Sequence, residues 1–424
     1  MDETIFAVSS GAPPAAIAVV RISGSKAALA LTTLTGGALP EPRRAVVRRL
    51  RNASGDILDE ALVLWFPAPK SATGEDCAEL HCHGGRAVVA AVCAALSAIS
   101  GVREAIAGEF TRRAFVNGLI DLAQAEALGD LLAAETELQR MVAQAGVGGE
   151  LSAEVTGWRD RVLSLSAAVE ASLDFSDEDD VPALPAGFHA HRRALADDIA
   201  CALARPRSER LRDGVRVVLA GPPNAGKSSL FNALLQCDAA IVTSVPGTTR
   251  DVLERAVSWH GVPFILIDTA GLREATDDPI ERMGIEKAQS EVSGADVVLW
   301  LGPEGEGPAG ALEVEARIDD PGAARKRTPV FRVSSVTNAG IEDMMVGLAA
   351  HARSVLPKPG TSAINARQGS LLEEAHQAII GDTADLLLQA EYLRCARSAF
   401  DRLLGNTATE DMLDTLFGRF CIGK

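Results

Sequence analysis

The feature that most limits how this chain can fold is the stretch VRVVLAGPPNAGKSSLFNALL, residues 215–235. It places an apolar strand, a glycine-rich loop and a helix directly after one another, and GPPNAGKS fits the phosphate-loop pattern G-x-x-x-x-G-K-[ST]. Backbone N–H groups at the start of such a helix converge on phosphate oxygens, so the stretch predicts a parallel α/β sheet with a phosphate site at its edge. Because the loop begins only at residue 221, other modules must precede it.

The apolar pattern changes three times along the chain and predicts a multidomain protein of α+β and α/β type. Residues 1–118 show short apolar runs broken by turns, as in a small α+β domain. Helical spacing follows over residues 119–211, in particular at Trp158, Val162, Leu165 and Val169, and helical character returns over residues 366–424. The strands FILIDTAG, DVVLWL and PVFRVSS continue the α/β pattern, so we expect an α/β domain, residues 212–356, inserted into a helical domain.

Composition excludes some classes of partner. The chain has 41 Lys and Arg against 57 Asp and Glu, a formal charge of −16, which argues against broad, sequence-independent binding of polyanions. Residues 1–120 are nearly balanced in charge and carry one basic cluster, for which a solvated strand face and a nucleic-acid contact are both open interpretations: Arg43, Arg44, Arg48, Arg49 and Arg51. The segment DFSDEDDVPALPAG, residues 174–187, is interpreted as an acidic solvated linker.

The chain shows no targeting signal in its sequence. The first residues, MDETIFAVSS, are acidic where a signal peptide is basic, and we find no apolar run of about 18 residues, the length needed to cross a bilayer. The 7 cysteines form no CxxC pair, which predicts reduced thiols. We therefore expect a cytoplasmic protein without membrane association.

Side chains from three segments are candidates for binding the phosphates and Mg²⁺. Lys227 supplies a charge to the β and γ oxygens, and the hydroxyls of Ser228 and Thr249 are candidate Mg²⁺ ligands. Asp268 ends an apolar strand about forty residues later, in DTAG, where its carboxylate can support the metal shell through water. The loop IVTSVPGTTRDV lies between the two and offers Thr248 and Thr249; the alternative interpretation is an ordinary Gly-Thr turn.

Together these motifs resemble the translation-factor-related GTPases, and the set GxPNxGKS, GTTRD and DTAGLRE resembles the MnmE (TrmE) family of bacterial tRNA-modification GTPases. The resemblance implies a Ras-like G domain that binds GTP and Mg²⁺. It also implies these nucleotide contacts: Asn224, Ala225, Gly226, Lys227, Ser228, Ser229, Thr243, Ser244, Val245, Pro246, Gly247, Thr248, Thr249, Asp268, Thr269, Ala270, Gly271, Asp319, Ser334 and Ser335.

The resemblance further implies a potassium ion that does the electrostatic work of an arginine finger. Its ligands would be Asn224, Thr243, Val245 and Thr248. An amide suits this position because a carboxylate would repel the phosphates and an apolar side chain offers no oxygen. Leu272 stands where many signalling GTPases carry a water-orienting glutamine, and the family resemblance gives that role to Glu281 in ERMGIEKA.

One motif departs from the family pattern. The NKxD loop, whose aspartate recognises guanine, is matched only by Ala316-Arg317-Ile318-Asp319, so the aspartate is kept and the asparagine is lost. The following loop, Ser334-Ser335-Val336, is also altered. We expect weakened guanine selectivity.

The resemblance extends over both ends of the chain. AVVRISGS, TGEDCAELHCHGG and GEFTRRAFVNGLIDLAQAEAL match long N-terminal motifs of the family, whose N-terminal domain is similar to folate-dependent one-carbon enzymes and dimerises. This implies a site for 5-formyl- or methylene-tetrahydrofolate formed by Arg21, Glu79, Leu119 and Lys424. His81, Cys82 and His83 allow zinc as an alternative, but no further ligand is evident.

The terminal segment FGRFCIGK matches the family's C-x-GK tail and implies that Cys421 takes part in tRNA modification, in a role that the sequence leaves open. The alternative interpretation is a buried thiol in a terminal apolar plug beside Phe417 and Phe420. Prenylation does not fit the final lysine.

The resemblance implies a homodimeric, K⁺-stimulated GTPase. With an MnmG-like FAD and NADH protein, in a heterotetramer, it would add an aminomethyl-type (carboxymethylaminomethyl) group to C5 of the wobble uridine of certain tRNAs. Two rivals remain. A ribosome-assembly switch of the Era or EngA type shares the phosphate motifs but not the N-terminal motifs. A scaffold with a degenerate G domain is allowed by Ala316, although Lys227, Ser228 and Asp268 are intact.

Overall fold

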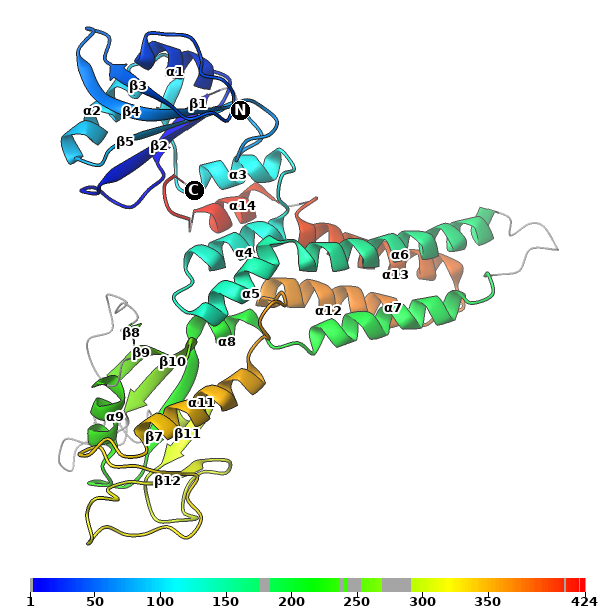
Figure 1. Ribbon diagram of the computed structural model, residues 1–424. Coiled ribbons are helices and arrows are strands. Elements are labelled where there is room, and N and C mark those ends of the chain that lie inside the picture. Colours follow the sequence, from blue (N-terminus) through cyan, green and yellow to red (C-terminus); the bar gives the residue numbers. More distant parts are fainter. Residues whose placement is uncertain are drawn as a thin grey trace, which may run out of the picture. The chain divides into compact units, whose positions relative to one another are not determined.

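The computed structural model describes residues 3–174, 184–236, 240–241, 253–268, 291–407, 409–418 and 420–423. The chain divides into two compact units, residues 1–129 with 401–424, and residues 130–400 (Figure 1). The first unit thus contains both ends of the chain. The predicted segments 243–249 and 269–271, with Glu281 and Lys424, lie outside the described residues.

The first unit is built on a six-stranded sheet in the order β3-β4-β5-β2-β1-β6, in which only the β1–β6 pair is parallel. Alternate residues of β2 point to opposite faces, so Val20 and Ile22 are buried on the face that α1 and α2 cover. Arg21 lies on the other face. The elements are β1 (Thr4–Val8), β2 (Ile17–Ser23), α1 (Ala27–Thr35), β3 (Val46–Arg51), β4 (Ile57–Phe66), β5 (Cys77–His83), α2 (Arg86–Ser97) and β6 (Val102–Glu104).

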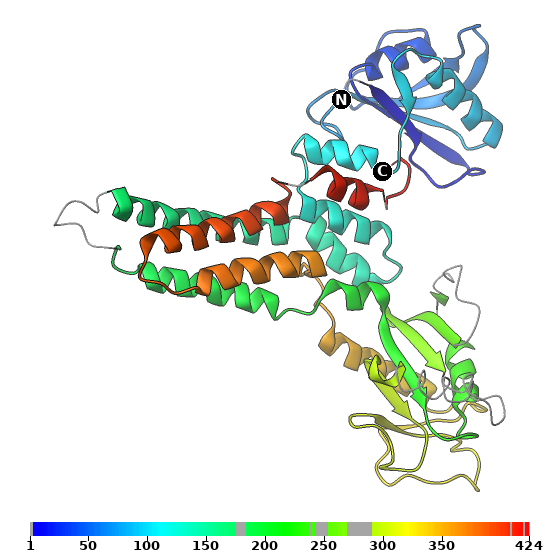
Figure 2. The same cartoon turned by 180° about the vertical axis from the view of Figure 1, so that it is seen from behind.

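The same unit continues with α3 (Glu109–Val116), the part of α4 (Leu122–Leu132) up to Gly129, and α14 (Glu410–Phe417). Figure 2 shows α14, in red, beside α3, in cyan. Leu122 and Ala125 of α4 share an apolar cluster with Leu413, Phe417 and Phe420. Residues near the C-terminus therefore share an apolar core with the helix α4, which comes after the N-terminal sheet in the chain.

The second unit contains the long helices that the apolar spacing predicts. In α6, Val155, Trp158, Val162, Leu165 and Val169 are buried, which confirms the predicted apolar face. The ring of Trp158 packs on that of Phe400 in α13 at 6.2 Å between centroids. The helices are α5 (Glu137–Val147), α6 (Glu150–Asp174), α7 (Phe188–Leu203), α8 (Ser208–Asp213), α11 (Ile341–Val355), α12 (Ala366–Ile380) and α13 (Leu386–Leu404).

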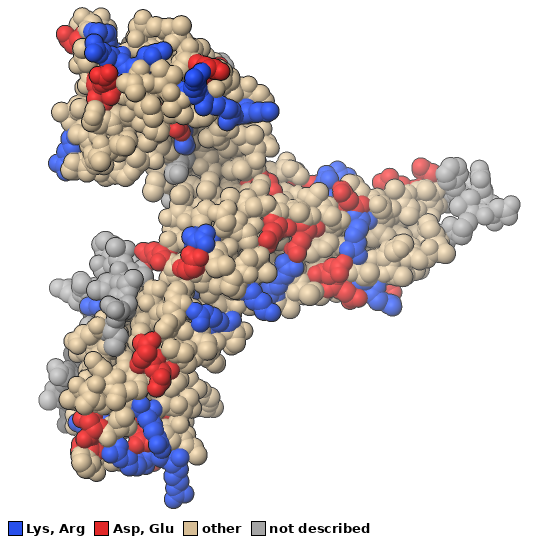
Figure 3. Space-filling model, viewed as in Figure 1, with Lys and Arg blue, Asp and Glu red and all other residues tan. Residues whose placement is uncertain are grey.

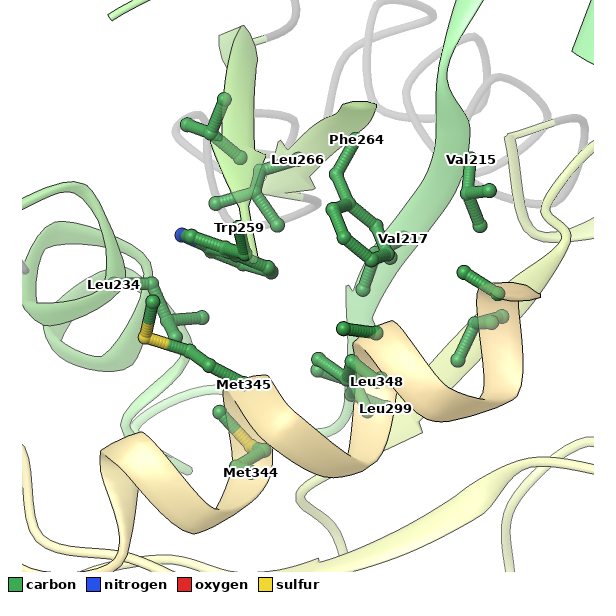
Figure 4. Packing of buried hydrophobic residues seen from close by; sticks show 14 of the residues in the cluster. Val215, Val217, Leu234, Trp259, Phe264, Leu266, Leu299, Met344, Met345 and Leu348 are labelled. Carbon is green, nitrogen blue, oxygen red and sulfur yellow. The ribbon is translucent and has the colours of Figure 1, made fainter. Parts of the chain in front are cut away.

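A seven-stranded sheet in the order β13-β12-β11-β7-β10-β9-β8 forms the α/β part of the second unit. The strands from β13 to β10 are parallel neighbours, and β9 and β8 are antiparallel. Figure 4 shows Leu348 of α11 beside Val217 and Leu299 of the sheet, and the side chain of Met345 extending toward Leu234. The elements are β7 (Val215–Ala220), α9 (Lys227–Gln236), β8 (Ala240–Ile241), β9 (Leu253–Trp259), β10 (Val262–Asp268), β11 (Val297–Trp300), β12 (Leu312–Glu315) and β13 (Phe331–Arg332).

Candidate functional site

The phosphate loop lies where the sequence predicts it, between β7, which ends at Ala220, and α9, which begins at Lys227. Three residues of the loop have positive φ angles, Gly221 at 148°, Asn224 at 63° and Gly226 at 95°. Asparagine is one of the few residues with a side chain that adopts this left-handed conformation at low cost. Asn224 therefore serves the turn of the loop while its side chain is exposed.

Lys227 is held inside the loop. Its side chain is only 5% exposed, and its Nζ donates hydrogen bonds to the carbonyl oxygens of Gly221 and Pro222, each at 3.0 Å. The ammonium is thus already placed at the centre of the loop, within reach of phosphate oxygens that enter it. Ser228 and Ser229 follow in the first turn of α9 and are exposed.

The strand that ends in Asp268 reaches the same edge of the sheet. β10 runs parallel to β7, with Asp268 opposite Leu219 in the register, so the two strands end side by side. The side chain of Asp268 is 1% exposed. A buried carboxylate at the end of a strand beside the phosphate loop is suited to support a metal shell.

A pocket of about 340 Å³ opens beside the phosphate loop. Its wall joins Gly226 and Ser229 of that loop region to Ala316, Arg317, Asp319 and Ser335. A Cβ atom placed on Gly226 would lie 4.0 Å from Ala316 Cβ and 4.0 Å from Arg317 Cγ, so the two loops are immediate neighbours. The residues that the sequence assigns to base recognition are thus brought together with the phosphate loop.

The two pocket loops that contain Arg317 and Ser334 are ordered by local hydrogen bonds. Arg317 has a φ of 60°, and the N–H of Asp320 donates to its carbonyl oxygen at 3.0 Å, which turns the chain at Asp319. In the second loop, the buried hydroxyl of Ser334 accepts hydrogen bonds from the backbone N–H groups of Val336 (3.2 Å) and Thr337 (3.1 Å). Ser335 is thereby left on the pocket wall.

In the first unit, Arg21 and Glu79 lie opposite each other on β2 and β5. The guanidinium donates from Nε and Nη2 to Glu79 Oε1, at 3.1 and 2.9 Å, and lies 5.9 Å from the centre of the Phe110 ring. His81 adds an Nε2–Oε2 contact with Glu79 at 3.3 Å. Leu119 is 43% exposed and lies near Gly74, and a Cβ on that glycine would be 3.5 Å from its Cδ1.

The zinc alternative for residues 81–83 finds no support in the described part of the chain, where no three His, Cys, Asp or Glu side chains form a metal-binding group. His83 faces Asp59 at 2.7 Å, whereas Cys82 is buried on the other face of the strand. Burial, with smaller contributions from Asp59 and Cys93, raises the pKa of the Cys82 thiol to about 12. A thiol of that kind is a poor metal ligand because the ligand is the thiolate.

The C-terminal tail lies against the first strand of the same unit. The hydroxyl of Ser9 donates to the carbonyl oxygen of Gly423 at 2.9 Å, and the N–H of Gly108 donates to that of Cys421 at 3.5 Å. Gly423 has a φ of 97°, and a Cβ there would come within 2.4 Å of the carbonyl oxygen of Val8. Only glycine fits this contact. Cys421 itself is exposed and stands beside the sheet that carries Arg21.

The basic cluster follows the edge strand β3 and the turn before it. Arg44 pairs with Glu41 at 2.8 Å and Arg49 lies 3.9 Å from Glu60. Figure 3 shows acidic and basic side chains interspersed over the face in view. These exposed pairs agree with a solvated strand face. Among the described residues, no helix is long and apolar enough to span a membrane.

Comparison with known proteins decides the family. The family model "GTP-binding protein TrmE N-terminus" matches residues 4–119, and "MnmE helical domain" matches residues 122–421. The chain belongs to the MnmE family. A tRNA modification GTPase MnmE of Erythrobacter litoralis is 61% identical over 424 residues, covering all of both chains. The corresponding protein of Novosphingobium aromaticivorans is 56% identical over 438 residues, again with full coverage of both.

Membership of the MnmE family makes the chain an enzyme that hydrolyses GTP, with the binding of GTP and Mg²⁺ that this requires. Among solved structures, the G domain of the Thermotoga maritima FeoB iron transporter is 25% identical and matches 32% of this chain and 98% of its own, with a TM-score of 0.24. A similarity at that level adds nothing to the assignment.

Two charged residues near the pocket were missed by the sequence interpretation, Glu315 and Arg325. Glu315 ends β12 and is 5% exposed, although nothing in a lone LEVE segment distinguishes a buried carboxylate from a solvated one. The one hint in the sequence is that Glu313 and Glu315 alternate in a short strand, because alternate residues of a strand lie on the same face and the two carboxylates would therefore share one.

Proposed function

We propose that the chain is a K⁺-stimulated GTPase of the cytoplasm that adds an aminomethyl-type group, as in carboxymethylaminomethyl uridine, to C5 of the wobble uridine of certain tRNAs. The observation that carries the proposal is the match of the whole chain, at 61% identity, to a protein named as a tRNA modification GTPase. The phosphate loop, the buried Lys227 and the adjoining pocket support the GTPase part.

In the proposed G domain, Lys227 holds the β and γ oxygens of GTP. Ser228 and Thr249 are the proposed Mg²⁺ ligands, with Asp268 acting through water. Glu281 orients the attacking water, because Leu272 cannot polarise one. The buried Asp268 and the inward Lys227 fit this division of roles. Base recognition falls to Asp319, with Ser334 and Ser335.

Bound K⁺ would supply positive charge next to the transferred phosphoryl group, as an arginine finger does in other GTPases. Its proposed ligands are Asn224, Thr243, Val245 and Thr248. The exposed position of Asn224 in a turn that converges on the phosphates fits an amide oxygen offered to a cation. Asn224 combines this role with the left-handed conformation that the loop needs.

In the first unit we propose that Arg21, Glu79, Leu119 and Lys424 bind a 5-formyl- or methylene-tetrahydrofolate, the donor of one carbon. The partly exposed ion pair of Arg21 and Glu79 offers a guanidinium and a carboxylate to a polar ligand. Cys421 acts in the tRNA modification. The hydrogen bond of Ser9 to Gly423 keeps the tail that carries Cys421 next to the same sheet.

The proposed assembly is a homodimer that works with an MnmG-like FAD and NADH protein in a heterotetramer, with tRNA as substrate. The rival function, an Era- or EngA-like ribosome-assembly switch, is not favoured, because residues 4–119 match the TrmE N-terminal model. A degenerate G domain would not require Lys227 to be placed in the loop as it is.

The proposal is tested by deleting the gene and measuring tRNA nucleosides by mass spectrometry. We expect the modified wobble uridine to disappear and to return when the wild-type gene is supplied. A Cys421→Ser gene should fail to restore it, whereas a gene with Cys201→Ser, another exposed cysteine, should restore it. Intact modification in the deletion strain would refute the proposed function.

A further inference from the structure

The base-side loop 316–320 is fastened to the sheet by a charged contact outside the family's motifs. Glu315, the last residue of β12, is 5% exposed, and its Oε1 lies 3.2 Å from a guanidinium nitrogen of Arg325. Its Oε2 lies 3.3 Å from Nε of Arg332. Because Glu315 is buried at the end of the strand, its hydrogen bond from Arg325 Nη1 holds that guanidinium beside β12.

Arg325 reaches from Glu315 to the loop itself. Its Nη2 donates to the carbonyl oxygens of Ile318 and Asp320, at 3.3 and 3.2 Å. These two carbonyls belong to the residues immediately before and after Asp319, so one guanidinium spans Asp319, which lines the pocket together with Asp320. The planar fork of arginine suits such a contact because its donors keep a fixed geometry.

The same loop lacks the asparagine amide that the NKxD pattern provides. Ala316 stands where the NKxD pattern has asparagine, and its methyl group packs on the apolar core of the sheet without any hydrogen-bonding group. We propose that Arg325, anchored by Glu315, is a positioning residue that fixes Asp319 for purine recognition in place of that asparagine. The inference rests on the proposed guanine pocket.

Lys326, the next residue, offers a control that distinguishes the positioning of Asp319 from general attachment of this segment to the sheet. Lys326 Nζ donates to the carbonyl oxygen of Trp300 at 2.8 Å and to Glu313 Oε2 at 2.5 Å. It therefore holds the same segment to β11 and β12, but neither of these two contacts involves the carbonyl oxygens on either side of Asp319. A Lys326→Met variant loosens the segment without removing the contact of Arg325 to the loop.

The test is a calorimetric measurement of the dissociation constants of the full-length protein for GDP and IDP. IDP lacks only the 2-amino group that a carboxylate at Asp319 would accept from. We expect Arg325→Ala to lower the preference for GDP over IDP by roughly fivefold, because one well-placed hydrogen bond changes affinity by about that factor. Lys326→Met and the exposed neighbour Arg327→Ala should keep the wild-type ratio.

The outcomes distinguish the inference from the proposed pocket. Equal weakening of GDP and IDP by Arg325→Ala, or an unchanged ratio, overturns the positioning role. Should Arg325→Ala fail to fold, Glu315→Gln replaces it, with a smaller fall in the same ratio expected and an unchanged ratio again contradicting the inference. Asp319→Asn tests the pocket itself: if it leaves the wild-type GDP preference intact, the guanine pocket fails whatever Arg325 does.

Discussion

At the scale of single residues, Asn224 joins a backbone requirement to a chemical one. Its φ of 63° is easily adopted by glycine and tolerated by asparagine, but disfavoured for most other residues. Its side-chain amide supplies the oxygen that we propose as a ligand of K⁺. Substitution with two different residues can therefore separate the backbone role from the amide role.

We expect Asn224→Gly to lower the K⁺ stimulation of GTP hydrolysis by at least about tenfold, because a ligand oxygen beside the transferred phosphoryl group is lost. Its affinity for GDP should stay near the wild-type value, since glycine keeps the left-handed turn. Asn224→Ala should lose the K⁺ stimulation and also bind GDP more weakly, because alanine strains the turn by about 1–2 kcal/mol. Rates in KCl and NaCl, with GDP titrations, measure both. A K⁺-stimulated Asn224→Gly protein would contradict the ligand role.

A second prediction concerns thiol reactivity. Burial, followed by the charges of Asp59 and Cys93, raises the pKa of Cys82 to about 12, so only about one part in ten thousand is thiolate at pH 8. Iodoacetamide should label the exposed Cys201 and Cys421 in the folded protein and leave Cys82 unlabelled until urea unfolds the first unit. Peptide mass spectrometry reads each site, and early labelling of Cys82 would show that its side of the sheet is open.

At the scale of elements, α3 is joined to β6 by a buried carboxylate. Glu109, the first residue of α3, accepts from Arg103 at 2.7 and 2.9 Å, from Arg113 at 3.1 Å and from the N–H of Ile106 at 3.0 Å. Burial by itself raises the pKa of Glu109, but the hydrogen bonds from Arg103, Ile106 and Arg113 together outweigh it and leave the pKa below its usual value of 4.5.

The sign of the resulting pH dependence follows from the lowered pKa. The contribution of Glu109 to stability is fully present above pH 4.5 and is lost as the pH falls through the lower pKa of the folded state. Glu109→Gln should lower the stability of the first unit near pH 7 by about 2–4 kcal/mol, since Arg103 and Arg113 each lose one of two carboxylate partners and keep only Glu3 and Glu75. It should also flatten the loss of stability in acid. Urea unfolding at pH 7 and pH 4 measures both, and parallel acid profiles for the two proteins would contradict the account.

Several elements followed from local patterns, and there are physical reasons why others did not. The strands β7, β10 and β11 and the helix α6 were predicted because unbroken apolar runs or a 3.6-residue period define them. The strand β12 was not, because LEVE alternates charge with apolar residues over four positions, as exposed segments also do. The phosphate loop could be placed from its motif, whereas Arg325 could not, because its partners are backbone carbonyls brought near by folding.

At the scale of the whole molecule, the two ends of the chain share one unit and the nucleotide loop belongs to the other. Phe417 is 2% exposed and packs with Leu122 and Leu413 in the first unit. Each unit has its own apolar core, so a ligand and a core substitution should report on different parts of the chain.

Calorimetry should therefore resolve two responses. GDP at one hundred times its dissociation constant should stabilise residues 130–400 by about 2.7 kcal/mol, visible as a rise of one thermal transition. Phe417→Ala should destabilise the other unit by about 3–5 kcal/mol and lower the midpoint temperature of that unit's own transition. A single transition that both changes shift together would show that the two units unfold as one.

The central claim, a GTPase that K⁺ activates through the phosphate loop, is tested most directly by steady-state hydrolysis of GTP, with ATP beside it, in KCl and in NaCl at equal ionic strength. We predict hydrolysis that is selective for GTP and much faster in KCl, with Asp319, which lines the pocket, selecting the base despite Ala316. Equal rates in the two salts, or equal use of ATP, would contradict the mechanism proposed for Asn224 and the pocket.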